Sequence, residues 1–164
     1  MGTEAPRHRR SHPTSDSTAI YHVTRLNPSE VSNQAVEDIR CLVSQLSGRT
    51  SELRIEDLRT SAEINHIFYA RLDADPATII GMACLVPMHL PQGLRLWVET
   101  FVVHEQFRRQ GIGTTIMHAI LAAAAEMGAE HVNLTCNQSR PEAHAFYEEV
   151  GFHQVATTVF RRPI

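Results

Sequence analysis

The sequence has no apolar run long enough to cross a membrane. Its longest apolar stretches, residues 119–125 and 78–86, fall short of the ~20 residues that a membrane-spanning helix needs. The first seventeen residues, MGTEAPRHRRSHPTSDS, contain no apolar segment of the kind found in secretory signals. Pro6 stands where a myristoylation signal has Ser or Thr. These absences predict a cytoplasmic protein without a membrane partner.

Cysteine is scarce, and the sequence shows no metal-binding pattern. Cys41, Cys84 and Cys136 are widely spaced, odd in number and surrounded by apolar residues, which favours buried free thiols over disulfides or a metal site. There are ten histidines, but their closest i, i+4 pair, His8 and His12, lies near the N-terminus, and Cys-x-x-Cys does not occur. We therefore expect no metal.

An excess of positive charge is also missing. The chain of 164 residues has 15 Lys and Arg against 18 Asp and Glu, a net charge of −3. This balance argues against nucleic acid as the main partner and suits a cationic substrate. A hydrophobic content of 43% fits one soluble domain. The polar residues 1–17, rich in Arg and His, are expected to be a disordered tail before a folded domain at 18–164.

Hydrophobic periodicity predicts an α+β fold. Asn27 and Glu30 indicate a capping box with Pro28 in the first helical turn, and Gly48 indicates the end of that helix. A hairpin connection is expected at residues 73–76. Strands are expected at residues 20–26, 64–72, 78–87, 94–103, 131–136 and 152–160, the last as one strand or a strand pair. Helices are expected at residues 28–47, 51–62, 114–127 and 141–150. The strand–helix–strand passage after residue 94 implies parallel pairing at the end of an antiparallel meander.

Two glycines stand close together at one strand-to-helix junction. The segment Arg108–Gly113, RRQGIG, joins the strand predicted at 94–103 to the helix predicted from Thr114. Glycines there allow backbone N–H groups to converge, and the helix N-terminus and two arginines add positive charge. The pattern predicts a phosphate-binding site where the sheet changes from antiparallel to parallel. The alternative is a loop with solvated arginines.

Three segments together resemble the acetyl-CoA-binding core of the GNAT superfamily of N-acetyltransferases. They are Val103–Gly113 (VHEQFRRQGIG), Leu134–Asn137 (LTCN) and Ala143–Phe152 (AHAFYEEVGF), which match in residue type and in spacing. The resemblance implies a mixed central sheet, in which an antiparallel meander is followed by a parallel strand pair that splays at the cofactor site, flanked by about four helices. The positions most similar to small-amine or aminoalkylphosphonate acetyltransferases are Asn137, Arg140, Ala143 and His144.

The resemblance also implies a binding site for acetyl-CoA as co-substrate. Main-chain amides of residues 108–114 would hold the pyrophosphate, and the main chain of Phe101 and Val103 would pair with the pantetheine arm. The residues expected to bind the cofactor are Phe101, Val102, Val103, Arg108, Arg109, Gln110, Gly111, Ile112, Gly113, Thr114, Asn137, Arg140, Ala143 and Phe146. Two positions depart from the family pattern. Glu105 replaces a common proline, and Arg140 replaces a common asparagine whose pantetheine contact we reassign to Asn137.

Tyr147 is the expected catalytic acid. It stands where the tyrosines of the family point at the departing sulfur, and a phenol of pKa ~10 can share its proton with a thiolate of pKa ~8.5. The alternative is an aromatic side chain that packs with Phe146 and Phe152 while its hydroxyl contacts water.

Glu99 is the expected base, and Trp97 and Glu99 are the expected substrate contacts. Counting by twos along the strand places Trp97, Glu99, Phe101 and Val103 on one face, which would line the cleft. A carboxylate there can take a proton from an ammonium group through a water molecule. The alternative for Glu99 is an ion pair across the sheet with an arginine, Arg71 or Arg95.

These features predict an acetyl-CoA-dependent N-acetyltransferase that acts on a primary amine of a small molecule. Direct transfer in a ternary complex is expected because no cysteine lies near an obvious base. Residues 49–62 and 88–95 are expected to shape the acceptor pocket. Protein or peptide acetylation and a non-catalytic acyl-CoA-binding sensor stay open as alternatives. A homodimer that pairs residues 155–160 across its interface is a further expectation.

Overall fold

A computed structural model of the protein describes residues 20–164, so the tail expected at residues 1–17 lies outside the described part. One sheet contains five strands in the order β1-β2-β3-β4-β5. They are β1 (Tyr21–Arg25), β2 (His66–Leu72), β3 (Asp75–Leu90), β4 (Gly93–Val103) and β5 (Val132–Leu134). The first four pair antiparallel, and β5 pairs parallel with β4. The predicted mixed sheet is therefore confirmed.

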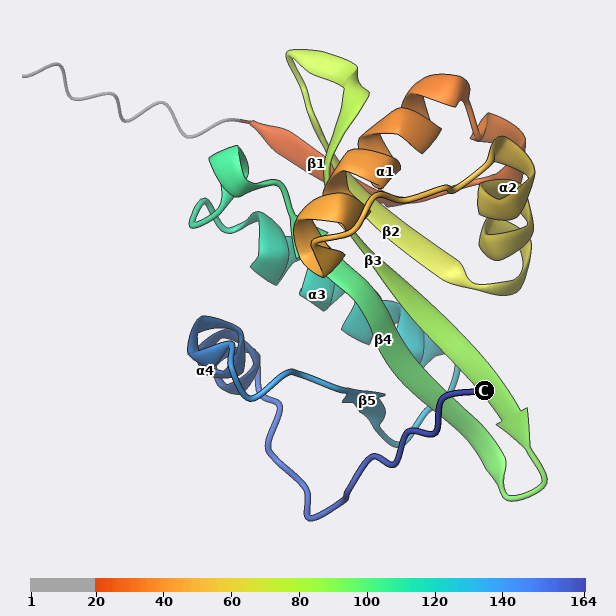
Figure 1. Cartoon of the computed structure of the whole chain (residues 1–164), viewed down its shortest axis with the longest axis vertical. Coiled ribbons are helices and arrows are strands. Elements are labelled where there is room, and N and C mark those ends of the chain that lie inside the picture. Colours follow the sequence, from red (N-terminus) through yellow and green to blue (C-terminus); the bar gives the residue numbers. More distant parts are fainter. Residues whose placement is uncertain (1–19) are drawn as a thin grey trace, which may run out of the picture.

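Four helices flank the sheet, as predicted. They are α1 (Asn33–Ser47), α2 (Ile55–Ile64), α3 (Ile112–Glu126) and α4 (Pro141–Glu149), with short 3-10 turns η1 (Pro28–Glu30) and η2 (Glu105–Phe107). Helices α1 and α2 cover one face of the sheet, α3 covers the other, and α4 lies beyond β5 (Figure 1). Each face therefore has its own apolar core, one around Leu42 and Tyr69 and one around Ile116 and Leu96. Within residues 20–164, no helix combines the length and the apolar character that crossing a membrane requires.

Helix α1 begins later than the capping box predicts. The Asn27 side chain accepts a hydrogen bond from the Ser29 amide at 3.0 Å, but it caps only η1. Val31 then returns to extended backbone, and the Ser32 hydroxyl accepts from the Ala35 amide at 3.2 Å to cap α1. Two competing caps five residues apart thus divide the segment into a turn and a helix. Gly48, with a left-handed φ of 68°, ends α1 as predicted.

The strand predicted at residues 152–160 is wrong. The chain after α4 is irregular, and residues 153–164 are all exposed. In the described chain this segment makes one backbone hydrogen bond, from the Thr157 amide to the Val155 carbonyl at 2.8 Å. Its β-branched residues favour a strand, but strand propensity has effect only where a neighbouring strand supplies the pairing.

The three cysteines are free, as expected, but only one of them is buried. Cys84 lies in the core under α1, Cys136 is half-buried and Cys41 is exposed on α1. An apolar sequence neighbourhood did not indicate burial at Cys41, because the burial of a helical residue depends on its side of the helix.

Asp38 ties α1 to the sheet, which leads to a stability prediction. Its Oδ2 accepts a hydrogen bond from the buried amide of Ile79 at 2.8 Å, and its Oδ1 accepts from Gln34 Nε2 at 2.8 Å. Asp38→Ala should lower the free energy of unfolding by about 1.5–3 kcal/mol, because it leaves the Ile79 amide without a partner. Urea denaturation measures this loss. The control is Glu37→Ala, which removes an exposed contact to Arg40 and should cost under ~0.5 kcal/mol. Equal losses in the two variants would contradict the prediction.

Candidate functional site

The turn between η2 and α3 presents a row of unpaired amides. Arg109 and Gly111 have left-handed φ values of 64° and 80°. The amides of residues 109–114 have no hydrogen-bond partner within residues 20–164, and the last three of them belong to the first turn of α3. Amides grouped in this way at a helix N-terminus make a concavity that binds anions. The predicted phosphate loop therefore has a geometry that can hold a phosphate.

Contacts from two sides define the shape of this turn. The Thr115 hydroxyl donates to the Gly111 carbonyl at 3.2 Å and lies 2.9 Å from the Tyr21 hydroxyl on β1. A Cβ atom at Gly111 would lie 3.3 Å from that Tyr21 hydroxyl, and one at Gly113 would lie 3.2 Å from the Phe101 ring. At Gly111 both the backbone conformation and the available space favour glycine.

The last third of β4 has an open edge beside this turn. Pairing with β5 runs from Leu96–Val132 to Val98–Leu134 and stops there, although β4 continues to Val103. The His104 amide donates to the Ile80 carbonyl on β3 at 2.8 Å. Because strand backbone groups alternate in direction, the main chains of Phe101 and Val103 face the open edge. An extended ligand can pair with such an edge as an added strand does.

A β-bulge interrupts β4 within the predicted site. The register with β3 is Met82–Val102 on one side of the bulge and Cys84–Glu99 on the other, so β4 contains an extra residue. Thr100 has a left-handed φ of 53° at this point. A bulge of this kind reverses the alternation of side chains along the strand.

The prediction that Trp97, Glu99, Phe101 and Val103 share one face is therefore wrong. Phe101 and Val103 pack into the core under α3 and α4. Trp97 and Glu99 lie on the α1 side, because their β3 partners belong to or pack against the core on that side. Counting by twos fails here because the bulge forms at a threonine, which gives no signal of a bulge in the sequence.

Glu99 and Trp97 both retain unused polar groups. Glu99 is exposed, and within residues 20–164 it forms no ion pair with Arg71 or Arg95. Burial, with a smaller contribution from the Glu99 charge, raises the pKa of the Cys84 thiol to about 11. The Trp97 indole N–H is buried without a hydrogen-bond partner in the described chain. A bound molecule on the α1 side of β4 can supply that partner.

Tyr147 lies in an aromatic cluster on the other side of β4. Phe101 stacks on Phe146 with ring centroids 5.2 Å apart, and the Tyr147 ring lies 6.0 Å from Phe101 and 6.0 Å from Phe152. Burial and, to a smaller extent, Cys136 raise the pKa of Tyr147 to about 12, and Arg140 opposes the shift. The phenol is thus protonated at neutral pH and can donate a proton.

Four residues expected to bind the cofactor have side chains that bond to protein groups, and one of them is Gln110, whose Nε2 donates to the Gln106 carbonyl at 3.4 Å. Arg108 Nε donates to the Val103 carbonyl at 3.0 Å, and Arg140 Nη2 donates to the Leu46 carbonyl at the end of α1 at 2.7 Å. Asn137 Oδ1 accepts from the Ser139 amide at 2.9 Å and shapes the turn before α4. In the described chain the Arg109 side chain makes no hydrogen bond to a protein group. Its charge is therefore available to a phosphate.

The end of α1 also contacts the loop side of the site, and this the sequence did not indicate. Gln45 Oε1 accepts a hydrogen bond from the Glu105 amide at 3.0 Å. The carbonyl of the next residue, Leu46, accepts the hydrogen bond from Arg140 described above. A helix C-terminus with free carbonyls attracts arginine, but nothing in the sequence relates residue 46 to residue 140.

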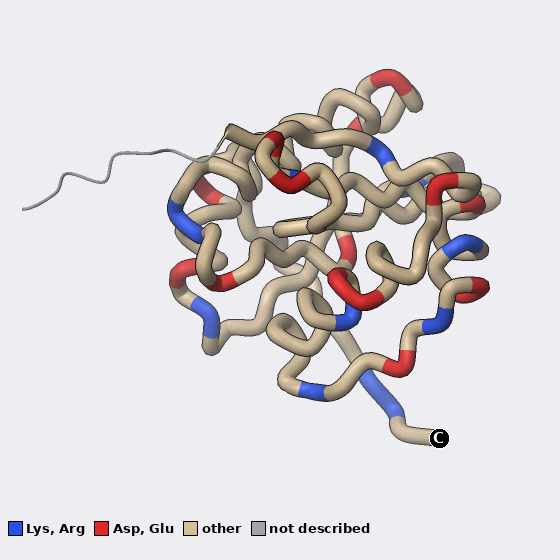
Figure 2. The backbone as a smooth tube through the Cα atoms, turned by 90° about the horizontal axis from the view of Figure 1, so that it is seen from above, with Lys and Arg blue, Asp and Glu red and all other residues tan. Residues whose placement is uncertain are grey.

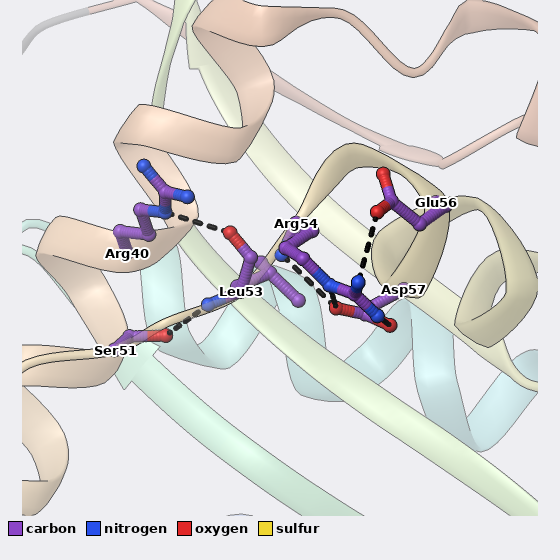
Figure 3. Close-up of polar contacts among 6 residues, drawn as sticks. All are labelled: Arg40, Ser51, Leu53, Arg54, Glu56 and Asp57. Carbon is purple, nitrogen blue, oxygen red and sulfur yellow. Dashed lines mark hydrogen bonds and ion pairs between the residues drawn. The ribbon is translucent and has the colours of Figure 1, made fainter.

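The connection between α1 and α2, expected to line the acceptor pocket, is held by polar contacts in its second half, next to α2 (Figure 3). Arg40 Nε donates to the Leu53 carbonyl at 2.7 Å, and the Leu53 amide donates to Ser51 Oγ at 3.4 Å. Arg54 Nε donates to Asp57 Oδ2 at 2.8 Å, and this hydrogen bond holds the pKa of Asp57 below its usual value. The connection therefore has a defined shape on the α1 side.

The two cavities described next do not coincide with the predicted acetyl-CoA site, and within residues 20–164 no metal-ligand cluster lies there. A cavity of about 290 Å³ between α3 and the β1–β2 edge is lined by Arg25, His66 and neighbours, and one of about 420 Å³ lies along α4. Neither is lined by Tyr147, Glu99 or the turn at 108–114. Within residues 20–164, no three His, Cys, Asp or Glu side chains lie close enough to hold a metal ion together. The site is thus defined by its strand edge and its loop.

Comparisons with known proteins agree with this geometry. The sequence model described as the "Acetyltransferase (GNAT) family" matches residues 34–152. The structure of glucosamine-6-phosphate N-acetyltransferase from Arabidopsis thaliana is similar, with a TM-score of 0.69 and 18% identity over 87% of this chain and 98% of that one. The structure of an aminoglycoside acetyltransferase from an uncultured soil metagenomic sample is also similar, with a TM-score of 0.73 and 18% identity over 87% of this chain and 97% of that one. A third similar structure is that of an aminoglycoside N-acetyltransferase in complex with CoA, with a TM-score of 0.68 and 16% identity over 88% of this chain and 95% of that one.

Two glycines that flank α3, Gly111 before it and Gly128 after it, allow a matched test of the loop. Gly111→Ala should weaken binding of CoA more than ~10-fold, because it strains the turn and approaches Tyr21. Gly128, at the other end of α3, also has positive φ (73°) but open space around it. Gly128→Ala should therefore lower the melting temperature similarly while leaving CoA affinity unchanged. Isothermal titration with CoA measures the difference, and equal affinities in both variants would exclude the loop as the binding site.

Proposed function

The chain belongs to the GNAT acetyltransferase family of acetyl-CoA-dependent N-acetyltransferases, and we propose that it acetylates the primary amine of a small molecule. The observation that carries the proposal is the open edge of β4 at Phe101 and Val103, next to the unpaired amides of residues 109–114. A strand edge followed by an anion-binding turn suits a ligand whose amide-bearing arm pairs with the edge and whose diphosphate binds to the turn. We assign this activity to a domain at residues 18–164.

In the proposed complex, acetyl-CoA lies along β4. The amides of residues 109–114 and the Arg109 charge bind the pyrophosphate. The Phe101 and Val103 main chains pair with the pantetheine arm, and a free N–H at Val103 polarises the thioester carbonyl. Gly113 and Phe146 shape the wall beside Phe101. Asn137, Arg140 and Arg108 contribute by holding the surrounding backbone, as their bonds to protein groups suggest.

Because of the bulge, the proposed base and the proposed acid lie on opposite faces of β4. Glu99, on the α1 side, takes a proton from the ammonium group of the acceptor, which at pKa ~10.4 is mostly charged at pH 7. Trp97 offers its unpartnered indole N–H to the same acceptor. Tyr147, on the α4 side, donates its proton to the departing thiolate. Attack from one side and departure toward the other is the geometry of direct transfer in a ternary complex.

A small-molecule acceptor is favoured by the three similar structures named above, all of which are described by small-molecule substrates. Thiol release from acetyl-CoA with a panel of amino sugars, aminoglycosides, aminoalkylphosphonates and lysine peptides tests the proposal. Turnover with peptides alone would favour a protein acetyltransferase, and CoA binding without turnover would favour a sensor. Because the chain contains no lysine, self-acetylation of lysine side chains cannot add to the signal.

Replacement of Tyr147 by Phe should lower kcat about 100-fold or more and leave the KM for acetyl-CoA nearly unchanged. Since burial raises the pKa of Tyr147 to about 12, the wild-type phenol stays protonated and kcat should show no loss from this group between pH 7 and 10. Steady-state kinetics across that range measure both effects. Tyr69→Phe, which removes a hydroxyl from the α1 core, is the control and should keep kcat. A Tyr147→Phe variant that keeps the wild-type kcat would contradict the proposed acid, whereas a decline near pH 9 that disappears in Tyr147→Phe would contradict only the raised pKa.

Replacement of Glu99 by Gln should lower kcat ten- to a hundredfold at pH 7. The deficit should shrink as the pH rises toward 10, because a growing fraction of the amine is already deprotonated and needs no base. Rates of wild type and variant measured from pH 6.5 to 10 give this ratio. Glu105→Gln, an exposed carboxylate after the end of β4, serves as control. A ratio independent of pH would show that Glu99 binds substrate without acting as a base.

A further inference from the structure

A cavity beside α3 lies apart from the predicted acetyl-CoA site. It has a volume of about 290 Å³ and is bounded by the paired strands β1 and β2 on one side and by α3 on the other. Arg25, His66 and Phe68 form its strand wall, and Glu126 and three alanines form its helix wall. The volume is near the lower end of the ~300–1,000 Å³ that is typical of small-molecule sites. A ligand smaller than most drugs would therefore fill it.

Strand alternation explains which residues form the strand wall. Tyr21 and Val23 of β1 pack against the core under α3, and Arg25 continues this row at the end of the strand. On β2, His66 precedes Phe68 of the same core by two residues. Arg25 and His66 thus lie on the α3 side of the sheet, at the margin where the apolar core ends.

The two walls of the cavity carry opposite charges. Arg25 belongs to the strand wall and Glu126 to the helix wall, and both residues are exposed. Within residues 20–164 the two side chains form no ion pair with each other or with any other residue. A ligand that carries both a negative and a positive group can pair with both walls at once.

His66 adds a polar group without adding charge. Burial and, to a smaller extent, the Arg25 charge lower the pKa of the His66 imidazole, so that the ring is neutral at pH 7.5. The lining then contains one positive and one negative charge. An anion would be repelled by Glu126 and a cation by Arg25, whereas a zwitterion is attracted to both. The neutral imidazole can also donate a hydrogen bond to a carboxylate.

The remaining lining is apolar and small. Ala119, Ala122 and Ala123 lie on the helix wall, where longer side chains would fill the cavity. Phe68, 8% exposed, supplies apolar surface on the strand wall. Apolar surface with a few polar groups around it is typical of sites that bind small molecules. This lining suits a short aliphatic group between the two charged ends of a ligand.

The surface as a whole does not favour a ligand of one charge sign. In Figure 2 arginines and acidic residues are interspersed along the described chain. Recognition at the cavity must therefore come from the charges of its own walls, which act at short range.

We infer that this cavity binds a small amino acid, whose carboxylate pairs with Arg25 and His66 and whose ammonium group pairs with Glu126. The inference is independent of acetyl transfer, because the residues of the cavity lining are not among those assigned to acetyl-CoA or to the acceptor amine.

The test uses L-valine and two analogues that each lack one of its charges. Isovalerate lacks the ammonium group, and isobutylamine lacks the carboxylate. Each is titrated into the full chain without acetyl-CoA, and the His66 ring signal, assigned with His66→Gln, is followed by proton–carbon correlation NMR. L-Valine should shift this signal with a Kd of ~10 mM or below, and each analogue should bind at least about tenfold more weakly.

Variants of the lining locate the bound amino acid. Glu126→Gln should make L-valine bind about as weakly as isovalerate, and Arg25→Gln about as weakly as isobutylamine, because each removes the partner of the group that the analogue lacks. Ala122→Leu retains both charges but fills the cavity, and should abolish binding. Glu130→Gln removes an exposed carboxylate after α3 that lies outside the lining, and should bind L-valine as the wild type does. Melting temperatures check that each variant is folded.

Three results would overturn the inference. The first is a His66 signal that does not shift in ~50 mM L-valine, several times the expected Kd. The second is an analogue that binds as tightly as L-valine, which would show a site for a single charge. The third is unchanged L-valine binding in folded Ala122→Leu, which would place the amino acid elsewhere. Thiol release by the wild type, measured separately, tests the proposed function and keeps the two results apart.

Discussion

The separation of β4 from β5 after Val98 is the constraint on which the rest of the site depends. Pairing ends there, and two residues later Thr100 adopts a left-handed backbone conformation. For a β-branched residue this conformation costs roughly 1–2 kcal/mol, so the surroundings must hold it in place. Phe101 does so on one face of the sheet by stacking on Phe146, and Val102 does so on the other from within the α1 core. Packing in the cores on both faces of the sheet thus maintains a strained residue between them.

This arrangement gives one strand two chemically different faces. Before the bulge, the odd-numbered side chains of β4 lie on the α1 side, where Glu99 keeps a free carboxylate. After it, they lie among the aromatic rings of α4, where a buried phenol holds its proton up to high pH. A regular strand would put the carboxylate and these aromatic rings in one environment, where its charge would be costly to bury. The bulge therefore allows Glu99, the proposed base, and Tyr147 of α4, the proposed acid, to lie on opposite faces of β4.

The sequence predicted the elements well and the details of β4 poorly. Helices and strands follow from periodicities that each segment contains by itself, as Gly48 at the end of α1 and the glycines before α3 illustrate. Family resemblance added the expected roles of the loop and of Tyr147, which stay predictions. The face of Glu99 could not be predicted, because a bulge at Thr100 depends on how β3 and β4 pair. The terminal segment was misassigned for a related reason, since its strand-forming residues pair with no other strand in the described chain.

Local dipoles, and not the overall charge, must account for anion binding by this protein. The net charge of −3 repels a polyphosphate at long range, and two of the arginines near the site already bond to carbonyls at Val103 and Leu46. Those bonds have a structural use, because they tie the end of β4 and the end of α1 to the loop and to α4. We propose that the diphosphate binds to Arg109 and to the amides of the turn, which have no other partner within residues 20–164. Preorganised donors need no rearrangement when the charge is bound, and at close range their effect exceeds that of distant surface charges screened by salt.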